Sequence, residues 1–382
     1  MARKLKSDKL LFSATLLLVC TSVVMVYSAS AVLAMEKMHE PYYFLVKQAV
    51  WVLIGLCALP IVMRIDYRTY RDPLVIWTLL GVAILALVAV LFGPKVKGAT
   101  RWLVMTGGIG VQPSELAKLA IIVFTAAVLE RRMHRIDDVS HSLLPIGVVL
   151  GGTAALILLQ PDLGTAFSIA MIVSVMVFAA GLNYSYLVGL FIASVPALYL
   201  LLAGSEYRWK RVEAFLDPWS DPLGKGHQMI QSMIAVGTGG IFGRGLMGGM
   251  QKLFYLPEPH NDFIYSVIAE ELGFVGATVI VGCFCVITWR GLRAAVRAPD
   301  QFGAFMAIGL TTMMAFQALL NISVVLGLLP TKGIPLPFVS AGGSSLLVNI
   351  IGMGMLLNIS QHAASSSHVV TTSLAAPNAA EA

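Results

Sequence analysis

Ten long apolar runs, separated by polar segments, limit what this chain can fold into more than any other feature. A helix needs about 20 apolar residues to cross the hydrocarbon core of a bilayer. The runs lie at 10–34, 43–63, 74–93, 113–130, 143–160, 163–182, 185–203, 263–289, 302–329 and 341–360. Only 12% of the residues are charged, whereas a soluble domain has roughly 25%. The sequence therefore predicts an all-α polytopic membrane protein with about ten transmembrane helices in a single membrane domain, residues 10–360.

The positions of the basic residues predict how these helices are oriented. Cytoplasmic loops are enriched in Lys and Arg, and one face of the predicted topology collects four clusters, namely Arg3/Lys4/Lys6/Lys9, Arg64/Arg68/Arg71, Arg131/Arg132/Arg135 and Arg290/Arg293/Arg297. We therefore expect both termini, residues 1–9 and 361–382, to be cytoplasmic. The second of these is rich in Ala, Ser and Thr without periodicity, so it is predicted to be a disordered tail. The large loop at 204–262, between the seventh and eighth spans, is then extracytoplasmic.

Many other basic residues fall on or near the outer face of this topology. They are Lys37, Lys95, Lys97, Arg101, Lys118, Arg208, Lys210, Arg211, Lys225, Arg244, Lys252 and Lys332. Long loops are translocated regardless of their charge, which accounts for the residues within 204–262. It accounts less well for those in short loops, which favour an anion site assembled from several loops. A phosphate-bearing lipid head group would fit such a site, and both interpretations remain open.

Two short segments near the fourth span carry polar residues at the predicted outer boundary. Arg101 and Trp102 are either an interfacial anchor or, through the guanidinium, a two-point grip on phosphate oxygens. Gln112 precedes a helix on which Glu115 and Lys118 share a face, because they are three residues apart. The two side chains either pair with each other or face a water-filled cavity. Asp162, at the outer end of the sixth span, is most simply a turn or capping residue.

The acidic stretch at 256–273 is the most unusual polar feature. Glu258, His260 and Asp262 end the long loop, and Glu270 and Glu271 follow within an apolar helix. Ionisable groups at a membrane boundary are costly and are usually functional. Asp262 alone is compatible with two roles, an ordinary helix N-cap or a catalytic carboxylate. Glu270 and Glu271 lie deeper and are expected to make buried polar contacts between helices.

Earlier in the same loop, residues 226–235 predict a short amphipathic helix with Gln228, Gln231 and Ser232 on its polar side. The glycine-dense run at 237–249 permits close backbone approach, as in a re-entrant hairpin or a phosphate cradle. It matches no nucleotide-binding pattern. The sequence contains no His, Cys and carboxylate cluster with metal-ligand spacing, and nothing in it indicates a nucleic-acid partner.

Five motifs together resemble those of the SEDS family, which comprises FtsW, RodA and SpoVE. They are Gly-Ala-Thr-Arg-Trp-Leu (98–103), Gln-Pro-Ser-Glu-Leu-Ala-Lys (112–118), Gln-Pro-Asp-Leu-Gly-Thr (160–165), Leu-Pro-Glu-Pro-His-Asn-Asp-Phe-Ile (256–264) and Gly-Ile-Pro-Leu-Pro-Phe-Val-Ser-Ala-Gly-Gly-Ser-Ser (333–345). The resemblance extends over about residues 10–360. The acidic motif and Ala341 are more similar to the division branch, FtsW, than to RodA. Asn261 stands where the family pattern usually has Thr, a small polar exchange.

The resemblance implies a peptidoglycan glycosyltransferase that polymerises lipid II at the outer face of the bacterial cytoplasmic membrane. It also implies a class B penicillin-binding transpeptidase and other division proteins as partners, at the division septum. Asp262 occupies the position of the family's catalytic base. No cofactor is required, although a divalent cation bridging the pyrophosphate of the substrate is compatible with the chemistry.

The remaining site residues are assigned by the needs of that reaction. Basic residues should stabilise the departing pyrophosphate, and we expect Arg101, Lys118, Arg211 and Lys332 to do so. Polar or neighbouring support is expected from Trp102, Gln112, Glu115, Gln231, Glu258, His260, Ser340 and Ser344. Two alternatives come from other classes of function, a lipid II flippase and a non-catalytic division scaffold. A flippase should carry polar residues along a path through the membrane, whereas the candidates here concentrate at one rim.

Overall fold

The computed structural model describes residues 7–94, 100–105, 109–133, 141, 143–253 and 255–374, and these residues are mostly helical. The long helices are α1 (Lys9–Met38), α2 (Tyr43–Arg64), α3 (Pro73–Leu91), α4 (Pro113–Arg132), α5 (Leu144–Leu159), α6 (Leu163–Ala179), α7 (Tyr184–Ala203), α10 (Ile264–Val296), α11 (Gln301–Val325) and α12 (Gly343–Leu374). The shorter elements are the 3-10 helix η1 (Tyr67–Arg71), the antiparallel strands β1 (Leu103–Met105) and β2 (Ile109–Val111), the helices α8 (Glu206–Leu216) and α9 (His227–Thr238), and the 3-10 helix η4 (Pro218–Ser220).

Each of the ten predicted spans corresponds to one of these long helices. Seven helices in the described part of the chain are long and apolar enough to cross a membrane, namely α1, α2, α3, α7, α10, α11 and the first part of α12. Helices α5 and α6 are apolar but shorter. Helix α4 has 20 residues and is more polar, because it contains Glu115 and Lys118 near its start and Glu130, Arg131 and Arg132 at its end. The all-α polytopic fold predicted from the sequence is confirmed.

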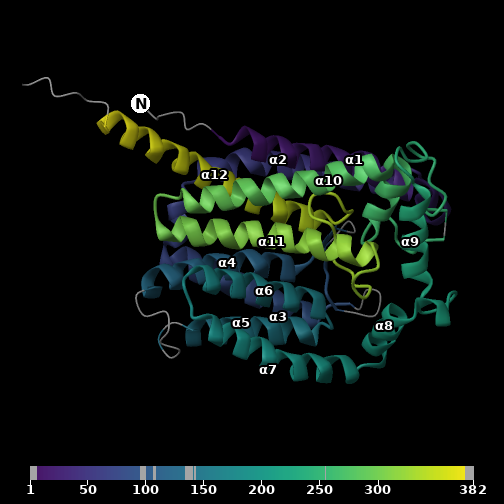
Figure 1. The fold of residues 1–382 in the computed structure, drawn as a ribbon, viewed down its shortest axis with the longest axis horizontal. Helices are drawn as coiled ribbons and strands as arrows, with labels where there is room; N and C mark the ends of the chain where they lie inside the picture. The colour runs from purple at the N-terminus through teal and green to yellow at the C-terminus, as the bar shows by residue number, and fades with distance from the viewer. Residues whose placement is uncertain are drawn as a thin grey trace, which may run out of the picture.

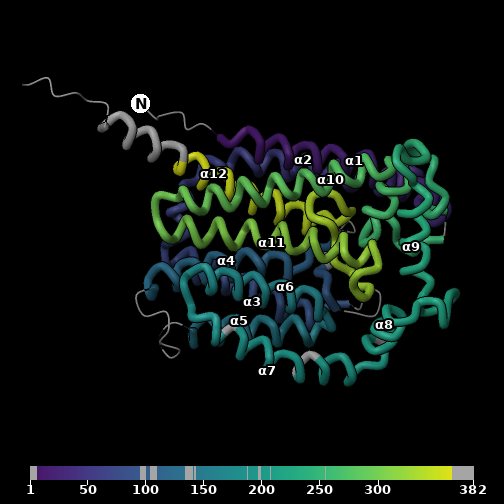
Figure 2. The backbone as a smooth tube through the Cα atoms, in the orientation of Figure 1, coloured from purple at the N-terminus to yellow at the C-terminus, as the bar shows by residue number. Residues whose placement is uncertain are grey.

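The helices form one bundle with α11 near its centre (Figure 1). Helix α11 packs against α10 on one side and against α4 and α6 on the other, and α12 packs along α2. Helices α1, α2, α10 and α12 lie along one edge of the bundle, and α3, α5 and α7 lie along the opposite edge (Figure 2). Helix α7 contacts α6 and α8, and none of its described side chains is buried.

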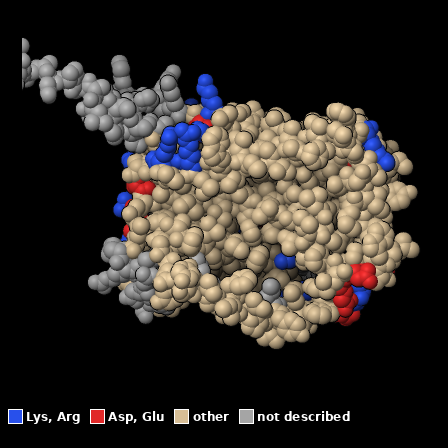
Figure 3. All heavy atoms as spheres, viewed as in Figure 1, with Lys and Arg blue, Asp and Glu red and all other residues tan. Residues whose placement is uncertain are grey.

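Charged side chains gather at the two ends of the bundle and are sparse on the belt between them (Figure 3). One end carries Arg68 and Arg71, which pair with Asp300 and Glu130. We call this the basic end. The other end carries the segment 204–262, and we call it the loop end. An uncharged belt between two charged ends is the pattern that a bilayer imposes on a multi-pass protein.

Two predicted segments differ in detail from the structure. Helix α12 continues to Leu374, past the predicted end at 360, because no Gly or Pro interrupts the chain before Pro377. Residues 375–382 of the predicted tail lie outside the described residues. The predicted amphipathic helix is present as α9, but Ser232 is not on its polar side. Its side chain is buried and its hydroxyl donates to the carbonyl oxygen of Val325 at 2.8 Å.

The start of α12 is fitted closely against Trp51 of α2. A Cβ added to Gly343 would lie 1.9 Å from Nε1 of the buried Trp51 ring, whereas a Cβ added to Gly342 would meet only the Cβ of Ser345, at 3.7 Å. The glycine at 343 is therefore required by close packing. Its neighbour has room for a methyl group.

We expect Gly343→Ala to lower the stability of the protein by about 1–3 kcal/mol, because the Trp51 ring must move within a packed interface. Gly342→Ala is the matched control and should change the stability much less. Thermal unfolding of the two variants in the same detergent measures the difference. Equal midpoints for both variants would show that the Trp51 contact does not constrain α12.

Candidate active site

Asp262 lies at the loop end, immediately before the start of α10. The N-cap of α10 is Phe263, with no side-chain capping bond, so the interpretation of Asp262 as an ordinary N-cap is wrong. Asp262 is partly exposed, and its carboxylate lies against the α11–α12 loop. A Cβ added to Gly333 in this loop would lie 3.0 Å from Oδ2 of Asp262. Asp262 is therefore partly exposed, with its carboxylate close to the backbone of Gly333.

Two amide side chains of α11 hold the α11–α12 loop, and one of them also holds the Asp262 motif. Nδ2 of Asn321 donates to the main-chain oxygens of Asp262, at 2.8 Å, and of Ile334, at 2.7 Å. Gln317 lies one turn earlier on the same face of the helix, and its Nε2 donates to the carbonyl oxygen of Pro335 at 3.1 Å. Both side chains are buried. We did not predict them from the sequence, although two amides four residues apart in an apolar helix are a readable signal.

Glu115 and Lys118 form a buried ion pair beneath this loop. Nζ of Lys118 lies 2.8 Å from Oε1 of Glu115, and both side chains are only 3% exposed. Lys118 also donates to Oε1 of Gln317 at 2.9 Å. The pairing interpretation of these residues is confirmed. Because Lys118 and Gln317 are linked, the ion pair supports the side chain that holds the α11–α12 loop.

Asp162 is a capping residue, as predicted, and it also receives a neighbouring side chain. The backbone N–H and the hydroxyl of Thr165 donate to its two carboxylate oxygens, at 3.2 and 2.9 Å. Nε2 of Gln112 donates to Oδ2 of Asp162 at 3.3 Å. The backbone N–H of Gln112 donates to Oγ of Ser344 at 3.2 Å. Gln112 thereby links the starts of α4, α6 and α12.

Three of the four predicted phosphate-binding cations surround the α11–α12 loop and the start of α6. Nζ of Lys332 lies 5.4 Å from the centre of the Phe167 ring. Arg211 donates to the carbonyl oxygen of Thr331 at 2.9 Å. Arg101 donates to the carbonyl oxygens of Gln160, at 3.0 Å, and of Pro161. The fourth, Lys118, is the buried residue described above.

A hollow opens in the face of the molecule between α11 and the α7–α8 segment, and basic side-chain atoms are visible inside it (Figure 3). Burial lowers the pKa of Lys332, the nearby charge of Arg211 lowers it further, and Asp162 partly offsets both effects. An anion bound beside Lys332 would favour its charged form. The electrostatics of this loop therefore suit a negatively charged ligand.

The lowered pKa of Lys332 predicts a pH dependence of stability. Between the folded-state pKa and the usual value of 10.5, the unfolded chain binds more protons than the folded chain, so stability rises with pH. We expect the wild type to gain stability relative to Lys332→Met as the pH increases toward 10.5. Lys225 is a control of opposite sign, because its hydrogen bond to Glu213 raises its pKa.

Unfolding midpoints of the wild type, Lys332→Met and Lys225→Met, measured across this pH range and on to pH values above 10.5, test the prediction. The stability that Lys225 contributes is present below its usual pKa and should be lost as the pH rises through its raised folded-state pKa. A difference between wild type and Lys332→Met that stays constant with pH would contradict the prediction for Lys332.

Several predicted site residues have mainly structural contacts. His260 is buried with its ring 4.5 Å from that of Phe44, and its carbonyl oxygen accepts from the N–H of Ala341 at 2.9 Å. Glu258 has a φ of 51° and accepts from Nδ2 of Asn261 at 2.9 Å. These contacts connect the acidic motif within itself and to the turn before α12.

Ser340 and Trp102 also make structural contacts, and Gln231 lies apart from the site. Oγ of Ser340 accepts the N–H of Leu336 at 2.8 Å, within the α11–α12 loop. The ring of Trp102 covers Gly110 of the β1–β2 pair, since a Cβ there would lie 3.1 Å from the indole. Gln231 lies on α9 with its side chain partly exposed. The contacts described for Asp262, Lys332 and Arg211 do not include it.

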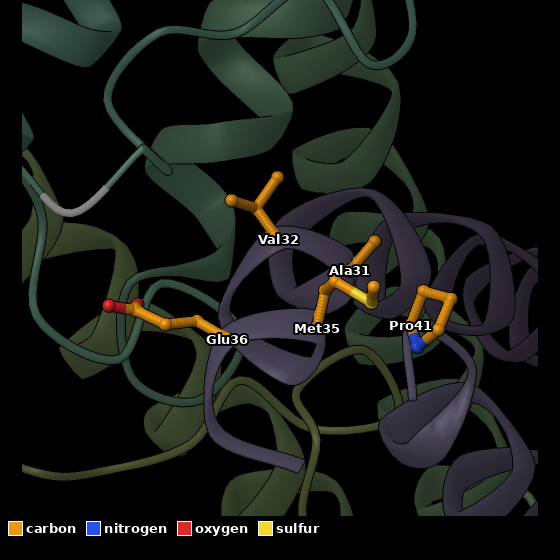
Figure 4. Close-up of a pocket in the computed structure, with 5 residues that line it drawn as sticks. All are labelled: Ala31, Val32, Met35, Glu36 and Pro41. Carbon is orange, nitrogen blue, oxygen red and sulfur yellow. The ribbon is translucent and has the colours of Figure 1, made fainter. Parts of the chain in front are cut away.

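Among the described residues, neither a depression at the end of α1 nor a metal cluster contributes to the site around Asp262. A depression of about 480 Å³ is lined by Ala31, Val32, Met35, Glu36 and Pro41 at the end of α1, with Glu36 pointing away from the rest (Figure 4). It contains none of the predicted site residues. Within the described ranges, no group of three or more His, Cys, Asp and Glu side chains could hold a metal ion.

The sequence matches a known family over most of its length. Residues 8–365 match the sequence model of the cell cycle protein family of FtsW, RodA and SpoVE. The chain belongs to this family. It is 45% identical over 345 residues to the probable peptidoglycan glycosyltransferase FtsW of Geobacter metallireducens, covering 90% of this chain and 92% of that one. It is 41% identical over 360 residues to the stage V sporulation protein E of Bacillus subtilis, covering 94% and 98%.

Solved structures of the FtsW, RodA and SpoVE family share the fold. A peptidoglycan synthase complex, described as coordinating polymerization and crosslinking, contains a chain with a TM-score of 0.77 and 32% identity, covering 94% of this chain and 98% of that one. The rod shape determining protein RodA of Thermus thermophilus matches with a TM-score of 0.69 and 29% identity, covering 94% and 97%. The resemblance stated from the five motifs is confirmed.

Proposed function

We propose that this chain is a peptidoglycan glycosyltransferase that polymerises lipid II, with Asp262 as the general base. The observation that carries the proposal is the placement of a partly exposed carboxylate against the loop that bears Lys332, next to Arg211. The names of the relatives, which include probable peptidoglycan glycosyltransferases, support the same activity.

Polymerisation requires the 4-hydroxyl of one lipid-linked disaccharide to attack the anomeric carbon of another. A hydroxyl is a weak nucleophile near neutral pH, so a carboxylate within about 3 Å of it accelerates the attack. Asp262 takes the proton as the C–O bond forms. The bond from the anomeric carbon to the pyrophosphate breaks on the opposite side, and the electron pair leaves with the lipid pyrophosphate.

The leaving group gains negative charge in the transition state, and fixed cations stabilise it there. Lys332, Arg211 and Arg101 supply these cations from three separate segments of the chain. Their main-chain contacts, at Thr331, Gln160 and Pro161, hold the two guanidinium groups in place before substrate arrives. The buried Glu115–Lys118 pair acts below the site by holding Gln317, and Gln112 and Ser344 position the helix ends.

We place the loop end outside the cytoplasmic membrane and the basic end inside, with both termini cytoplasmic. The four basic clusters of the sequence favour this orientation. The substrate is carried by a lipid, so its pyrophosphate lies at head-group level, near the loop end. The similarity to FtsW favours a role in septal wall synthesis during cell division.

A protein partner is part of this proposal. A solved chain similar to this one belongs to a synthase complex that coordinates polymerization with crosslinking. We therefore propose that this chain works with a class B penicillin-binding transpeptidase, together with other division proteins. The transpeptidase would crosslink the strands that this chain makes.

Reconstitution tests the activity directly. The chain is placed in vesicles with its transpeptidase partner and supplied with lipid II, and glycan strands are resolved by electrophoresis. Strand formation supports the polymerase. Movement of lipid II across the bilayer without strands would instead favour the flippase. Neither strands nor movement, in a preparation where the transpeptidase binds, would favour the scaffold.

A further inference from the structure

Residues 239–250, which we call the glycine hairpin, present a patch of apolar side chains at the loop end. Ile241, Phe242, Leu246, Met247 and Met250 are all exposed, and Phe242 is 82% exposed. The hairpin has no Asp or Glu, and its one charged residue is Arg244. Large apolar patches on a protein surface mark contacts with a partner or a membrane.

The hairpin is fixed to α10 by its backbone. The N–H groups of Phe274 and Val275 donate to the carbonyl oxygens of Gly240 and Ile241, at 2.9 and 3.1 Å. Gly273 makes this possible, because its φ of 68° breaks the helical path of α10 beside the hairpin. The hairpin therefore sits at the level of Phe274 and Val275 along α10.

The uncharged stretch of α10 shows how deep the hairpin lies in a bilayer. From Phe274 to Trp289 helix α10 has no charged residue, and Phe274, Val279 and Trp289 are exposed. Trp289 followed by Arg290 is typical of a helix leaving the hydrocarbon core. The two ends of this stretch are about 22 Å apart at 1.5 Å per residue, whereas the hydrocarbon core is about 30 Å thick. The core therefore reaches past Phe274, to the level of the hairpin.

Irregular backbone at this depth requires acceptors for its N–H groups, and the chain supplies them. Carboxylate oxygens of Glu270 accept from the N–H of Met250 at 2.7 Å and of Gln251 at 3.2 Å. A carboxylate oxygen of Glu271 accepts from the N–H of Met247 at 3.2 Å. The N–H groups of Arg244 and Gly245 donate instead to the main-chain oxygens of Glu270 and Glu271, both at 3.0 Å. Amides that a phosphate cradle would offer are thus bound within the protein, which favours the re-entrant interpretation of this segment.

We propose that the glycine hairpin inserts its apolar side chains into the lipid leaflet at the loop end, near the boundary between head groups and acyl chains. Nη1 of Arg244 lies 3.6 Å from Oε1 of Glu270, and the Arg244 side chain is partly exposed. This position suits a side chain that extends toward the lipid head groups. The hairpin leads through residues 251–261 to Asp262, so this contact anchors the catalytic motif to the membrane surface. The membrane contact does not depend on the proposed reaction.

Site-specific fluorescence in proteoliposomes tests the proposal. The four native cysteines are replaced by Ala, and a polarity-sensitive bimane label is attached at Phe242→Cys. Leu223→Cys, 90% exposed between η4 and α9, is the water-facing control. Phe191→Cys, 70% exposed on α7, is the lipid-facing control. The bimane emission of each protein is measured in phosphatidylglycerol–phosphatidylcholine vesicles. Brominated phosphatidylcholine is the quencher from the lipid, and iodide is the quencher from the water.

We expect the label at Phe242 to behave like the label at Phe191. Its emission should shift to the blue, brominated lipid should quench it and iodide should not. Quenching by iodide at the level seen for Leu223 would overturn the proposal. Shielding from both quenchers, as when another protein surface covers the patch, would also overturn it. Leu246→Cys repeats the measurement at a second hairpin position, in case the first variant does not fold.

Discussion

Asp262→Asn is expected to lower the rate of glycan polymerisation by roughly 10²–10⁴-fold, the contribution of a well-placed general base. The amide has nearly the same shape as the carboxylate but cannot accept the proton of the attacking hydroxyl. The motif should keep its position, because Asn321 binds the main-chain oxygen of Asp262 and not its side chain. The measurement is strand formation from lipid II in vesicles that contain the transpeptidase partner.

Asp217→Asn is the matched control, because Asp217 is an exposed Asp in the same extramembrane segment, at the end of α8. It should leave polymerisation unchanged. Both variants should unfold at the temperature of the wild type, which excludes misfolding as the cause of any loss. Full strand yield from Asp262→Asn would show that Asp262 is not the general base. Glu258 would then be the next candidate.

Lys252→Met is expected to destabilise the protein by about 3–5 kcal/mol, because it leaves the buried Glu271 without its counter-ion. Nζ of Lys252 lies 2.5 Å from Oε1 of Glu271, both side chains are almost fully buried, and Ser28 of α1 bonds to the same carboxylate. Thermal or denaturant unfolding in a fixed detergent measures the loss.

A double variant, Lys252→Met with Glu271→Gln, should recover much of that stability, because no unpaired charge then remains. Lys225→Met is the control, since the Lys225–Glu213 pair has a similar distance, 2.8 Å, but is exposed, and exposed pairs contribute little. If Lys252→Met were as mild as Lys225→Met, the Glu271 carboxylate would not depend on Lys252 for its burial.

The sequence predicts most of the fold because a bilayer imposes a simple rule on the chain. Ten apolar runs correspond to ten long helices, and caps such as Asp72, Asp162 and Asp300 mark several of their starts. The span predicted at 341–360 matches the apolar part of α12, Gly343–Ala363, and the helix itself continues to Leu374. For the glycine-dense run the sequence leaves two alternatives, a re-entrant hairpin or a phosphate cradle, because the course of 239–250 depends on backbone bonds to α10.

The candidate site is partly readable from the sequence. The motif at 256–264 identifies Asp262, and the charge needs of the reaction point to Lys332 and Arg211. The structure brings the segments of all three together at the α11–α12 loop. Sequence patterns do not show burial across distant segments, so the sequence leaves open whether Lys118 pairs with Glu115 or faces a cavity, and the structure shows the buried pair. The spacing of Asn321 and Gln317 in an apolar helix is a readable signal, but it does not show that their partners are main-chain groups of distant segments.

The hydrogen bonds of Asn321 have a mechanical consequence. One amide nitrogen ties the backbone of Asp262 to that of Ile334, two residues from Lys332. The proposed proton acceptor and a proposed cation for the leaving group are therefore tied to the same residue of α11. A displacement of α11 would carry both together and preserve their spacing. Control of this enzyme by a partner would then act on how the sugar chains reach the pair, with the pair itself already assembled at rest.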